Sequence, residues 1–277
     1  MSRLLVFGPG YTATRIMAAA GARGWAARAI DRAALADAGG VADAIAWSTH
    51  ILSSVPPGDD GADPVLAHHG PALAASGRII AYLSSTGVYG DSGGGWIDES
   101  APLVPGRRPG RATADRAWAA LSPDSFVFRL PGIYGPGRSA LDRVAAGTAY
   151  RVELSGHVFS RVHVDDIVTA VLLGLEGGPA GSYNLADDNP APQFTVTTYA
   201  ATLLGVAPPP LVPPAALPPA ARAFYAASRR VANGRAKRLL GWRPLYPDFR
   251  SGLRALSAMI SPTSVSSPPA TAGPDQR

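Results

Sequence analysis

The most informative residues of this 277-residue chain lie near its start and read Leu4-Leu5-Val6-Phe7-Gly8-Pro9-Gly10-Tyr11-Thr12-Ala13. Four consecutive apolar residues that stop at a glycine are typical of a buried parallel strand. The apolar pattern that follows predicts a helix over residues 12–21. A strand that enters a helix through such a glycine-rich turn is the arrangement that binds the pyrophosphate of a dinucleotide.

Each residue of this turn has a separate task. Gly8 permits a tight turn, and Gly10 lets the backbone approach a pyrophosphate without an intervening side chain. Ala13 takes the place of a third glycine, where helix–strand packing needs only a small side chain. The N–H groups of Tyr11, Thr12 and Ala13 would then face the phosphate oxygens at the positive end of the helix dipole.

An acidic residue follows at the expected distance. Asp31 stands 18 positions beyond Ala13, at the end of a second predicted strand over residues 25–30. A carboxylate there accepts hydrogen bonds from the hydroxyls of the adenosine ribose, and we expect this role for Asp31. Asp31 favours NAD in this role, whereas Arg32 favours NADP, because a guanidinium holds the 2′-phosphate of NADP that Asp31 would repel. The sequence predicts NAD or NADP and slightly favours NAD.

Strands and helices continue to alternate after this unit. Apolar runs predict strands at residues 49–55, 78–84 and 126–130, and helices at residues 64–76 and about 112–121. Such an alternation predicts an α/β fold built on a doubly wound, parallel Rossmann sheet.

The pattern changes to shorter elements and proline clusters beyond residue 135, which predicts a smaller C-terminal substrate lobe. We place the dinucleotide-binding core at residues 1–135, with residues 160–180 returning to it, and the lobe at residues 136–159 and 181–260. Residues 261–277 are rich in Ser, Pro, Thr and Ala without periodicity. They are expected to form a disordered tail.

Composition narrows the class of protein. The net charge is +5 and the pI about 9.8, but the arginines are scattered and Lys237 is the only lysine. A nucleic-acid groove would interleave basic and aromatic residues, so none is expected. Cysteine is absent, and the five histidines show no metal-ligand spacing, so neither disulfides nor a metal are expected. Without a signal-peptide pattern or a long apolar run, a cytoplasmic protein with no membrane contact is expected.

Five later motifs resemble, in order, the signatures of the extended short-chain dehydrogenases/reductases, the NAD-dependent epimerase/dehydratase family. The resemblance covers residues 1 to about 257, and the short middle region with residues 50–57 (HILSSVPP) looks most like an atypical branch of that family. The five motifs are residues 82–90 (YLSSTGVYG), 129–137 (RLPGIYGPG), 161–167 (RVHVDDI), 183–186 (YNLA) and 240–244 (LGWRP).

This resemblance implies positions for the cofactor. Ser54-Val55-Pro56 would line its adenosine side. Pro131 and Ile133 would lie near the nicotinamide, and Ser84 would also belong to the cofactor-binding residues. It also implies a homodimer formed through a helix pair, to which residues 112–121 would contribute.

The resemblance assigns the substrate side as well. Ser85 falls where the family places the hydroxyl that hydrogen-bonds the reacting group of the substrate, and Thr86 would contact the substrate beside it. Arg161 falls where many relatives contact an anionic part of the substrate, often the phosphate of a nucleotide sugar. A surface ion pair is the alternative role for Arg161.

The chain departs from the family at the catalytic pair. The family uses Tyr-x-x-x-Lys, in which the lysine lowers the pKa of the tyrosine so that it works as an acid/base group. Here the matching stretch, residues 106–115, reads GRRPGRATAD, and no tyrosine lies between Tyr89 and Tyr134. Tyr89 and Tyr134 are therefore the candidate catalytic residues beside Ser85.

Two other residues enter the choice. Arg111 would supply the positive charge of the missing lysine, although an arginine does not act as a base. His163 has a suitable intrinsic pKa, but a histidine packed at a helix start is the more common arrangement. Two functions follow. The first is an NAD(P)-dependent oxidoreductase or epimerase acting on a small polar substrate, such as a nucleotide sugar. The second is a non-catalytic NAD(P)-binding sensor or scaffold.

Overall fold

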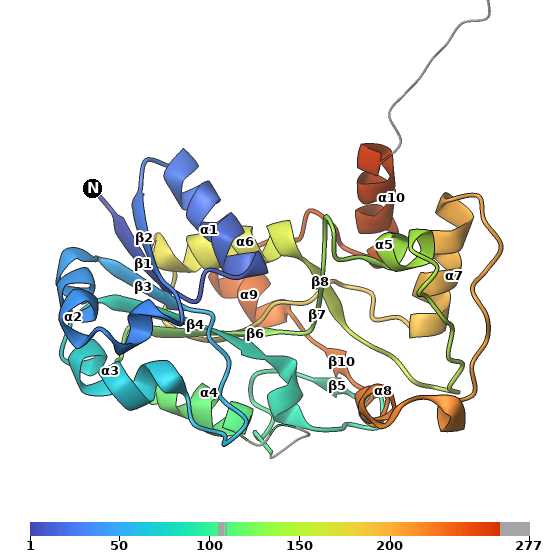
Figure 1. Ribbon diagram of the computed structural model, residues 1–277, viewed down its shortest axis with the longest axis horizontal. Coiled ribbons are helices and arrows are strands. Elements are labelled where there is room, and N and C mark those ends of the chain that lie inside the picture. The colour runs from blue at the N-terminus through green and yellow to red at the C-terminus, as the bar shows by residue number, and fades with distance from the viewer. Residues whose placement is uncertain (105–107, 109, 261–277) are drawn as a thin grey trace, which may run out of the picture.

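The computed structural model describes residues 1–104, 108 and 110–260, and its centre is one six-stranded sheet (Figure 1). The strand order is β2-β1-β3-β4-β6-β9, and every neighbouring pair is parallel. The predicted doubly wound α/β fold is confirmed. The six strands are β1 (Arg3–Phe7), β2 (Ala26–Ile30), β3 (His50–Ser53), β4 (Ile79–Ser85), β6 (Ser125–Leu130) and β9 (Gly181–Asn184).

Helices cover both faces of this sheet. On one face lie α1 (Tyr11–Ala22) and α6 (Val164–Leu175), with α9 (Gly234–Leu239) beside them (Figure 1). On the other lie α2 (Ala38–Trp47), α3 (Pro64–Ala74) and α4 (Gly110–Ala120). Both faces are therefore apolar, as the continuous apolar runs of the strands require.

Single contacts show how the two layers are fixed. On the α1–α6 face, Phe126, Phe128 and Tyr183 stack on one another with ring centroids 5.9–6.3 Å apart. On the α4 face, Tyr82 stacks on Trp118 at 5.2 Å, and the Trp118 indole N–H donates to Asp63 at 2.8 Å. Asp63 also caps α3, so one carboxylate joins two helices.

The chain reverses its direction of strand addition between β1 and β3. From β1 it adds β2 on one side, and all later strands on the other side begin with β3. In open parallel sheets a ligand crevice forms outside the carboxyl ends of the strands at such a switch point. Gly8 and Ser54, which directly follow β1 and β3, lie at this point.

The second lobe lies at one end of the sheet (Figure 1). Its helices α5 (Ala140–Ala145), α7 (Gln193–Leu203) and α10 (Phe249–Ile260) share one apolar cluster. Two small parallel pairs connect it to the core. They are β7 (Gly132–Tyr134) with β8 (Arg161–His163), and β5 (Trp96–Ile97) with β10 (Arg230–Val231). The remaining elements are η1 (Ala34–Ala36), η2 (Thr86–Tyr89), η3 (Pro214–Ala216) and α8 (Pro219–Phe224).

Most expected elements of the first 130 residues are present, with ends shifted by one or two residues. The Ala-rich stretch before β3, for which no element is predicted above, forms helix α2, and Asp37 caps it by accepting from the Gly40 N–H at 3.0 Å. One feature differs from the sequence prediction. Strand β9 pairs with β6 in the central sheet, so residues 181–184 extend the core rather than the lobe. The predicted disordered tail lies outside the described residues.

Candidate cofactor and substrate site

The two positions Gly8 and Gly10 of the first turn are occupied by glycine for different structural reasons. Gly8 has a φ of +76°, and a Cβ there would lie 2.7 Å from Val55 Cγ2, so both backbone and packing require glycine. Gly10 begins α1 at an ordinary φ of −86°, and a Cβ there would meet nothing within 4 Å. No protein atom therefore requires Gly10 to be glycine. The open space above it fits a ligand that approaches the uncapped helix start.

Hydrogen bonds hold this turn against the neighbouring strands. The Gly8 N–H donates to the carbonyl of Ile30 at 2.9 Å, which places the end of β2 beside the turn. The Ser54 hydroxyl donates to the carbonyl of Gly8 at 2.5 Å, and the Ser54 N–H donates to the carbonyl of Phe7 at 2.9 Å. The loops after β1, β2 and β3 thus form one rigid edge, as dinucleotide binding at this edge requires.

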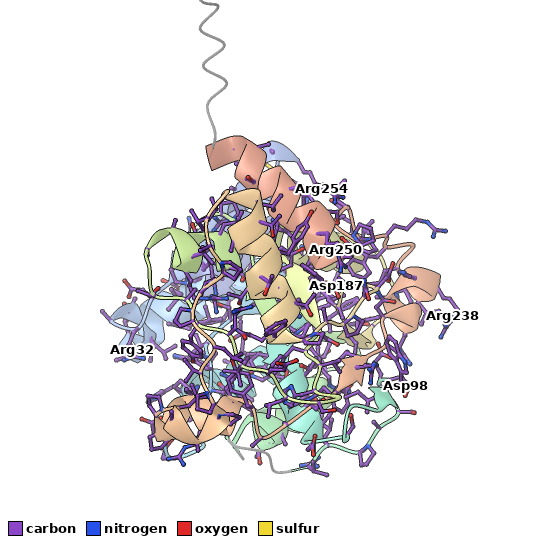
Figure 2. The ribbon with its side chains drawn as sticks, turned by 90° about the vertical axis from the view of Figure 1, so that its right-hand side faces the viewer. Arg32, Asp98, Asp187, Arg238, Arg250 and Arg254 are labelled. Carbon is purple, nitrogen blue, oxygen red and sulfur yellow. The ribbon has the colours of Figure 1, made fainter. Side chains whose placement is uncertain are left out.

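Asp31 and Arg32 follow β2 at this edge and are exposed. One Asp31 carboxylate oxygen accepts from the Ala34 N–H at 2.9 Å and so holds η1 in place. Figure 2 shows Arg32 at the periphery of the molecule. Neither residue lines the large cavity described next. Their predicted ribose and 2′-phosphate contacts remain predictions.

One cavity of about 1160 Å³ extends from the start of α1, past the carboxyl ends of β4 and β6, into the second lobe. Most residues predicted for the site surround it, although they come from distant parts of the sequence. Gly8, Ala13 and Val55, which are also predicted for the site, do not line it. The predicted residues that line it are Gly10, Tyr11, Thr12, Ser54, Pro56, Ser84, Ser85, Thr86, Pro131, Ile133, Tyr134 and Arg161.

The cavity is strongly cationic. Among the described residues, Asp91 is the single acidic residue that lines it, against six arginines. Arg138, Arg143 and Arg161 form no ion pair within the described part of the chain. A cavity of this charge attracts anions such as phosphates and carboxylates. The six are Arg108, Arg111, Arg138, Arg143, Arg161 and Arg229.

The serines at the end of β4 have opposite hydrogen-bonding states. The Ser84 hydroxyl donates to the Asp115 carboxylate at 2.6 Å. The Ser85 oxygen accepts from the Gly87 N–H at 3.1 Å, and its hydroxyl proton has no partner among the described residues. Ser85 is half-buried and lines the cavity. It is therefore able to donate a hydrogen bond to a reacting atom.

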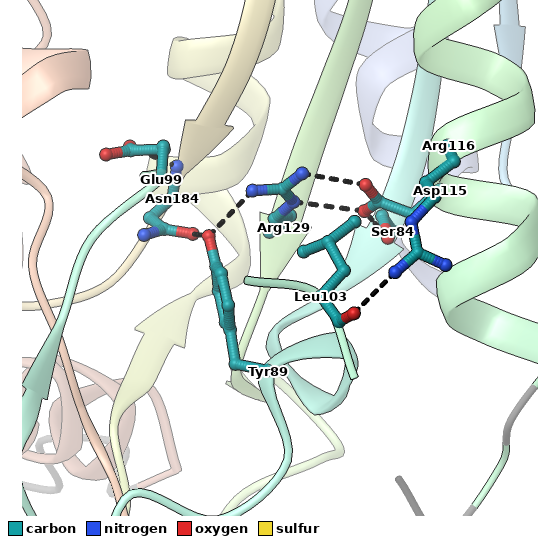
Figure 3. A network of polar contacts seen from close by, with 8 residues as sticks. All are labelled: Ser84, Tyr89, Glu99, Leu103, Asp115, Arg116, Arg129 and Asn184. Atoms are coloured by element: carbon teal, nitrogen blue, oxygen red, sulfur yellow. Dashed lines mark hydrogen bonds and ion pairs between the residues drawn. The ribbon is translucent and has the colours of Figure 1, made fainter. Parts of the chain in front are cut away.

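Tyr89 does not face the cavity, which corrects its expected catalytic position. Its hydroxyl accepts from Arg129 Nη1 at 2.8 Å and donates to Asn184 Oδ1 at 2.8 Å (Figure 3). The ring is 6% exposed, and burial raises the pKa of Tyr89 although Arg129 opposes this. Both hydrogen-bonding positions of the hydroxyl are thus used within the protein.

Tyr134 lines the cavity, but its hydroxyl points toward α10. It donates to the carbonyl of Asp248 at 3.5 Å, and a Cβ at Gly252 would lie 2.1 Å from its oxygen. Burial raises the pKa of Tyr134 well above its ordinary value, and the charge of Asp187 raises it further. Tyr134 is therefore a wall of the cavity and is not poised to accept a proton near neutral pH.

Arg161 is not part of a surface ion pair. Its Nη1 donates to the carbonyls of Phe159 at 3.0 Å and Ala191 at 2.7 Å, which fixes the guanidinium in the cavity wall. Burial lowers the pKa of Arg161 to about 10, so it stays charged at neutral pH. The expected anion contact is compatible with this placement.

His163 is packed at the start of α6. It is buried, its Nδ1 accepts from the Asp165 N–H at 3.3 Å, and its ring lies 5.1 Å from that of Tyr134. It does not line the cavity. This is the arrangement expected for a capping histidine, and burial lowers its pKa.

Sequence reasoning missed several residues around the cavity. Arg143 and Arg229 stand outside recognisable catalytic patterns, and only the three-dimensional arrangement brings them to the cavity. Asp115 and Asp187 are buried acids that do not line it. Asp115 is fully buried against Arg129, and Asp187 is buried with no hydrogen-bond partner for its carboxylate among the described residues. The sequence offers one signal for these residues: Asp187 directly follows the motif at residues 183–186.

The described residues contain neither a metal-binding cluster nor a membrane-spanning helix. No group of three His, Asp or Glu side chains in that part of the chain is arranged to hold a metal ion. Within the same residues, no helix has the length and apolar character needed to cross a membrane.

Among curated proteins, one reductase is similar in sequence to this chain. The chain is 37% identical over 201 residues to a 3-diazoavenalumate denitrifying reductase from Streptomyces, and the match covers 66% of each protein. About a third of that reductase therefore lies outside the match. No family model matches the chain.

Solved structures give the same fold over nearly the whole chain. A functionally unknown conserved protein from Silicibacter pomeroyi is 40% identical, with a TM-score of 0.83, and the match covers 94% of this chain and 99% of that one. A dTDP-glucose 4,6-dehydratase from Bacillus anthracis in complex with NAD is 17% identical, with a TM-score of 0.75 and coverage of 93% and 96%. A short-chain dehydrogenase/reductase superfamily protein from Agrobacterium tumefaciens with bound NAD is 17% identical, with a TM-score of 0.70 and coverage of 92% and 96%.

Proposed function

The chain belongs to the extended short-chain dehydrogenase/reductase family of NAD-dependent epimerases and dehydratases. We propose that it is an NAD(P)H-dependent reductase of a small anionic substrate. One observation carries the proposal. A single cavity joins the uncapped start of α1 to an arginine-lined lobe, so one site offers room for a dinucleotide and an anion side by side.

The residues of the first turn fit the pyrophosphate. The open space over Gly10 leaves the N–H groups at the start of α1 accessible to phosphate oxygens, and Arg138 lines the same cavity. Ser54 and Pro56 would contact the adenosine side, while Ser84 and the loop after β6 would face the nicotinamide. When bound there, the reduced nicotinamide supplies a hydride.

The substrate would lie between Ser85 and Arg161. Ser85 has a free hydroxyl proton, so it would donate to the atom that gains electron density. Arg161, fixed by two carbonyls, would hold an anionic group of the substrate. Thr86 is buried beside Ser85, and its carbonyl accepts from Arg229 Nη1 at 2.7 Å, which positions this second arginine.

The choice of a reductase rests on the relative and on the changed catalytic pair. Reduction of a carbonyl needs a proton as well as a hydride, and the family supplies that proton from its Tyr-x-x-x-Lys tyrosine. Because this site lacks that tyrosine, the acceptor that suits it best is one that takes up a hydride and needs no proton from the protein. An aryl diazonium group is of this kind, because the hydride adds to the ring carbon while the C–N bond breaks and dinitrogen leaves. The Streptomyces relative is named a denitrifying reductase of a diazo compound.

Two other functions remain candidates for the test. A nucleotide sugar is a second anionic substrate for an arginine-lined cavity. The missing Tyr-x-x-x-Lys pair favours a non-catalytic NAD(P)-binding sensor, whose cofactor site would be intact.

Binding and hydride transfer are measured separately. Fluorescence titration with NADH and NADPH tests the cofactor site. Reduced cofactor deuterated at C4 is then incubated with an aryl diazo carboxylate, a ketone and UDP-glucose, and the products are analysed by mass spectrometry. We expect deuterium in the product of the diazo carboxylate. Cofactor binding with no deuterium in any product would establish the sensor, and no binding of either cofactor would remove both functions.

A further inference from the structure

The lobe end of the cavity has one aromatic wall. Phe224, the last residue of α8, stacks on Phe159 with ring centroids 4.5 Å apart and an interplanar angle of 18°. Tyr225 closes the group edge-on, 5.6 Å from the Phe159 ring. All three side chains line the cavity, yet Phe224 remains 49% exposed. A large apolar ring left half open at a cavity wall offers a surface on which another flat ring stacks.

Two guanidinium groups lie beside this wall. Arg161 Cζ is 5.9 Å from the centroid of the Phe159 ring. Arg143 of α5, Arg161 and Tyr225 line the same cavity. Burial raises the pKa of Tyr225 to about 12, and the charges of both arginines oppose this rise.

Arg143 and Arg161 form no ion pair within the described residues. Asp187, whose charge acts on Arg161, is buried, and burial raises the pKa of Asp187 to about 8. Below that pH its carboxyl is mainly neutral. The positive charge is left for a ligand.

We infer that this end of the cavity is a subsite for an aromatic carboxylate, whose ring stacks on Phe224 and whose anionic group lies between Arg143 and Arg161. The inference rests on the proposed reductase function and names its substrate class. Aromatic stacking supplies the affinity of the ring, and a guanidinium pairs with a carboxylate through two parallel hydrogen bonds.

The aromatic wall and a cation lie within the length of one small ligand. Arg161 Cζ is 5.9 Å from the centroid of the Phe159 ring, and Phe224 stacks on that ring at 4.5 Å. A ring that carries its carboxylate directly or on a short chain therefore suits both. In a nucleoside diphosphate the ribose separates the flat base from its charges, and UDP-glucose is the competing ligand in the test.

The test is a set of binding measurements on the purified protein, by isothermal titration calorimetry with and without NADPH. The probe is 4-hydroxycinnamate, compared with its neutral methyl ester, cyclohexanecarboxylate, inorganic pyrophosphate and UDP-glucose. We expect 4-hydroxycinnamate to bind at least about tenfold more tightly than either its ester or the non-aromatic acid. Equal binding of the ester, tighter binding of UDP-glucose, or no saturable binding of 4-hydroxycinnamate would overturn the inference.

Variants locate the binding site. Arg143→Gln is expected to weaken 4-hydroxycinnamate binding about tenfold and Phe224→Leu about fivefold. Arg222→Gln, an exposed arginine on α8 outside the cavity lining, is the matched control and should change nothing. NADPH affinity and melting temperature report folding and the cofactor site in each variant. If NADPH binding fails while 4-hydroxycinnamate binds, the proposed function is lost but the subsite remains. Unchanged binding in both Arg143→Gln and Phe224→Leu would refute the subsite.

Discussion

Arg129 and Asp115 form a bidentate ion pair inside the wall of the cavity, with Nε to Oδ2 at 3.1 Å and Nη2 to Oδ1 at 2.8 Å (Figure 3). Asp115 is fully buried and Arg129 is 5% exposed. The pair joins α4 to β6, and Ser84 and Tyr89 extend it to β4 and η2. Helix α4 thus supplies a structural anchor at the stretch where the family resemblance would place the Tyr-x-x-x-Lys pair.

Removal of Asp115 should be strongly destabilising. In Asp115→Ala the Arg129 charge stays buried without its partner, which costs about 3–5 kcal/mol of unfolding free energy. Urea unfolding of the wild type and the variant measures this. The double variant Asp115→Leu with Arg129→Met removes both charges and should recover most of the loss.

The exposed pair Arg23–Glu176, whose side chains are 41% and 36% exposed, provides the control for that experiment. Glu176→Gln should cost less than about 1 kcal/mol, because solvent screens an exposed pair. A loss in Asp115→Ala no larger than that in Glu176→Gln would show that the buried pair is not an anchor.

The two glycines of the first turn should separate folding from cofactor binding. Gly8→Ala forces an alanine into a φ of +76° with its Cβ 2.7 Å from Val55 Cγ2, and it should lower the melting temperature by several degrees. Gly10→Ala meets no protein atom, so the melting temperature should hold while NADPH affinity falls at least about tenfold. Calorimetry and fluorescence titration give the two readouts. NADPH affinity that Gly10→Ala leaves intact would place the pyrophosphate elsewhere.

Asp31 and Arg32 should decide between the two cofactors. Arg32→Gln removes a partner of the 2′-phosphate and should weaken NADPH but not NADH. Asp31→Asn removes a repelling charge and should strengthen NADPH relative to NADH, with a change in the ratio of roughly tenfold. Titration of each variant with both cofactors gives the ratio. Because Asp31 also holds η1, the ratio is the readout rather than the absolute affinity. Equal changes for both cofactors in both variants would contradict these roles.

Ser85 and Tyr89 should differ in what they affect. Ser85→Ala removes the hydroxyl that lines the cavity and should lower kcat about tenfold or more, with little change in the unfolding free energy. Tyr89→Phe removes the hydrogen-bond partner of Arg129 Nη1 and of Asn184 Oδ1, while the Arg129–Asp115 pair stays, and should cost about 1–3 kcal/mol of stability. Its kcat at a temperature where it is folded should stay close to that of the wild type. A large fall of kcat in stable Tyr89→Phe would return Tyr89 to the catalytic group.

The sequence predicts which motifs gather at one edge of the sheet, because each motif is a local pattern. The turn after β1, the acid after β2 and the Ser-Ser-Thr segment after β4 each sit at the end of a buried strand. Parallel strands bring such ends to one edge, so these motifs lie there without any further information. The positions of Ser84, Ser85 and Pro131 follow from the same rule, while the cofactor contacts of Asp31 and Arg32 stay predictions.

The substrate side of the cavity is not predictable from the sequence in this way. Arg143, Phe159 and Phe224 come from α5, a loop and α8, and no spacing in the sequence relates them. Tyr89 lies in a recognisable motif, but the motif does not predict where its hydroxyl points. Arg129 and Asn184, which lie 40 and 95 residues away in the sequence, set that direction. Asp187 follows the recognisable YNLA motif, yet its burial is set by packing of the lobe.

Asp187 should make stability depend on pH in a definite direction. Burial raises the pKa of Asp187 from 3.8 to about 8, opposed by Arg161 and assisted by Asp188 and Asp248. The folded protein then holds a proton that the unfolded chain has lost above about pH 4. The unfolding free energy therefore falls as pH rises between about 4 and 8, by at most about 1.4 kcal/mol per pH unit.

Asp187→Asn carries a neutral amide of similar shape and lacks this titration. We expect its melting temperature, relative to that of the wild type, to rise steadily from pH 5 to pH 8. The nearby Asp166, whose pKa burial raises to about 6, is present in both proteins and so cancels in the difference. A thermal melt of each protein at half-unit steps of pH measures the effect. Parallel melting curves across this range would show that Asp187 is ionised in the folded state and that it pairs with Arg161.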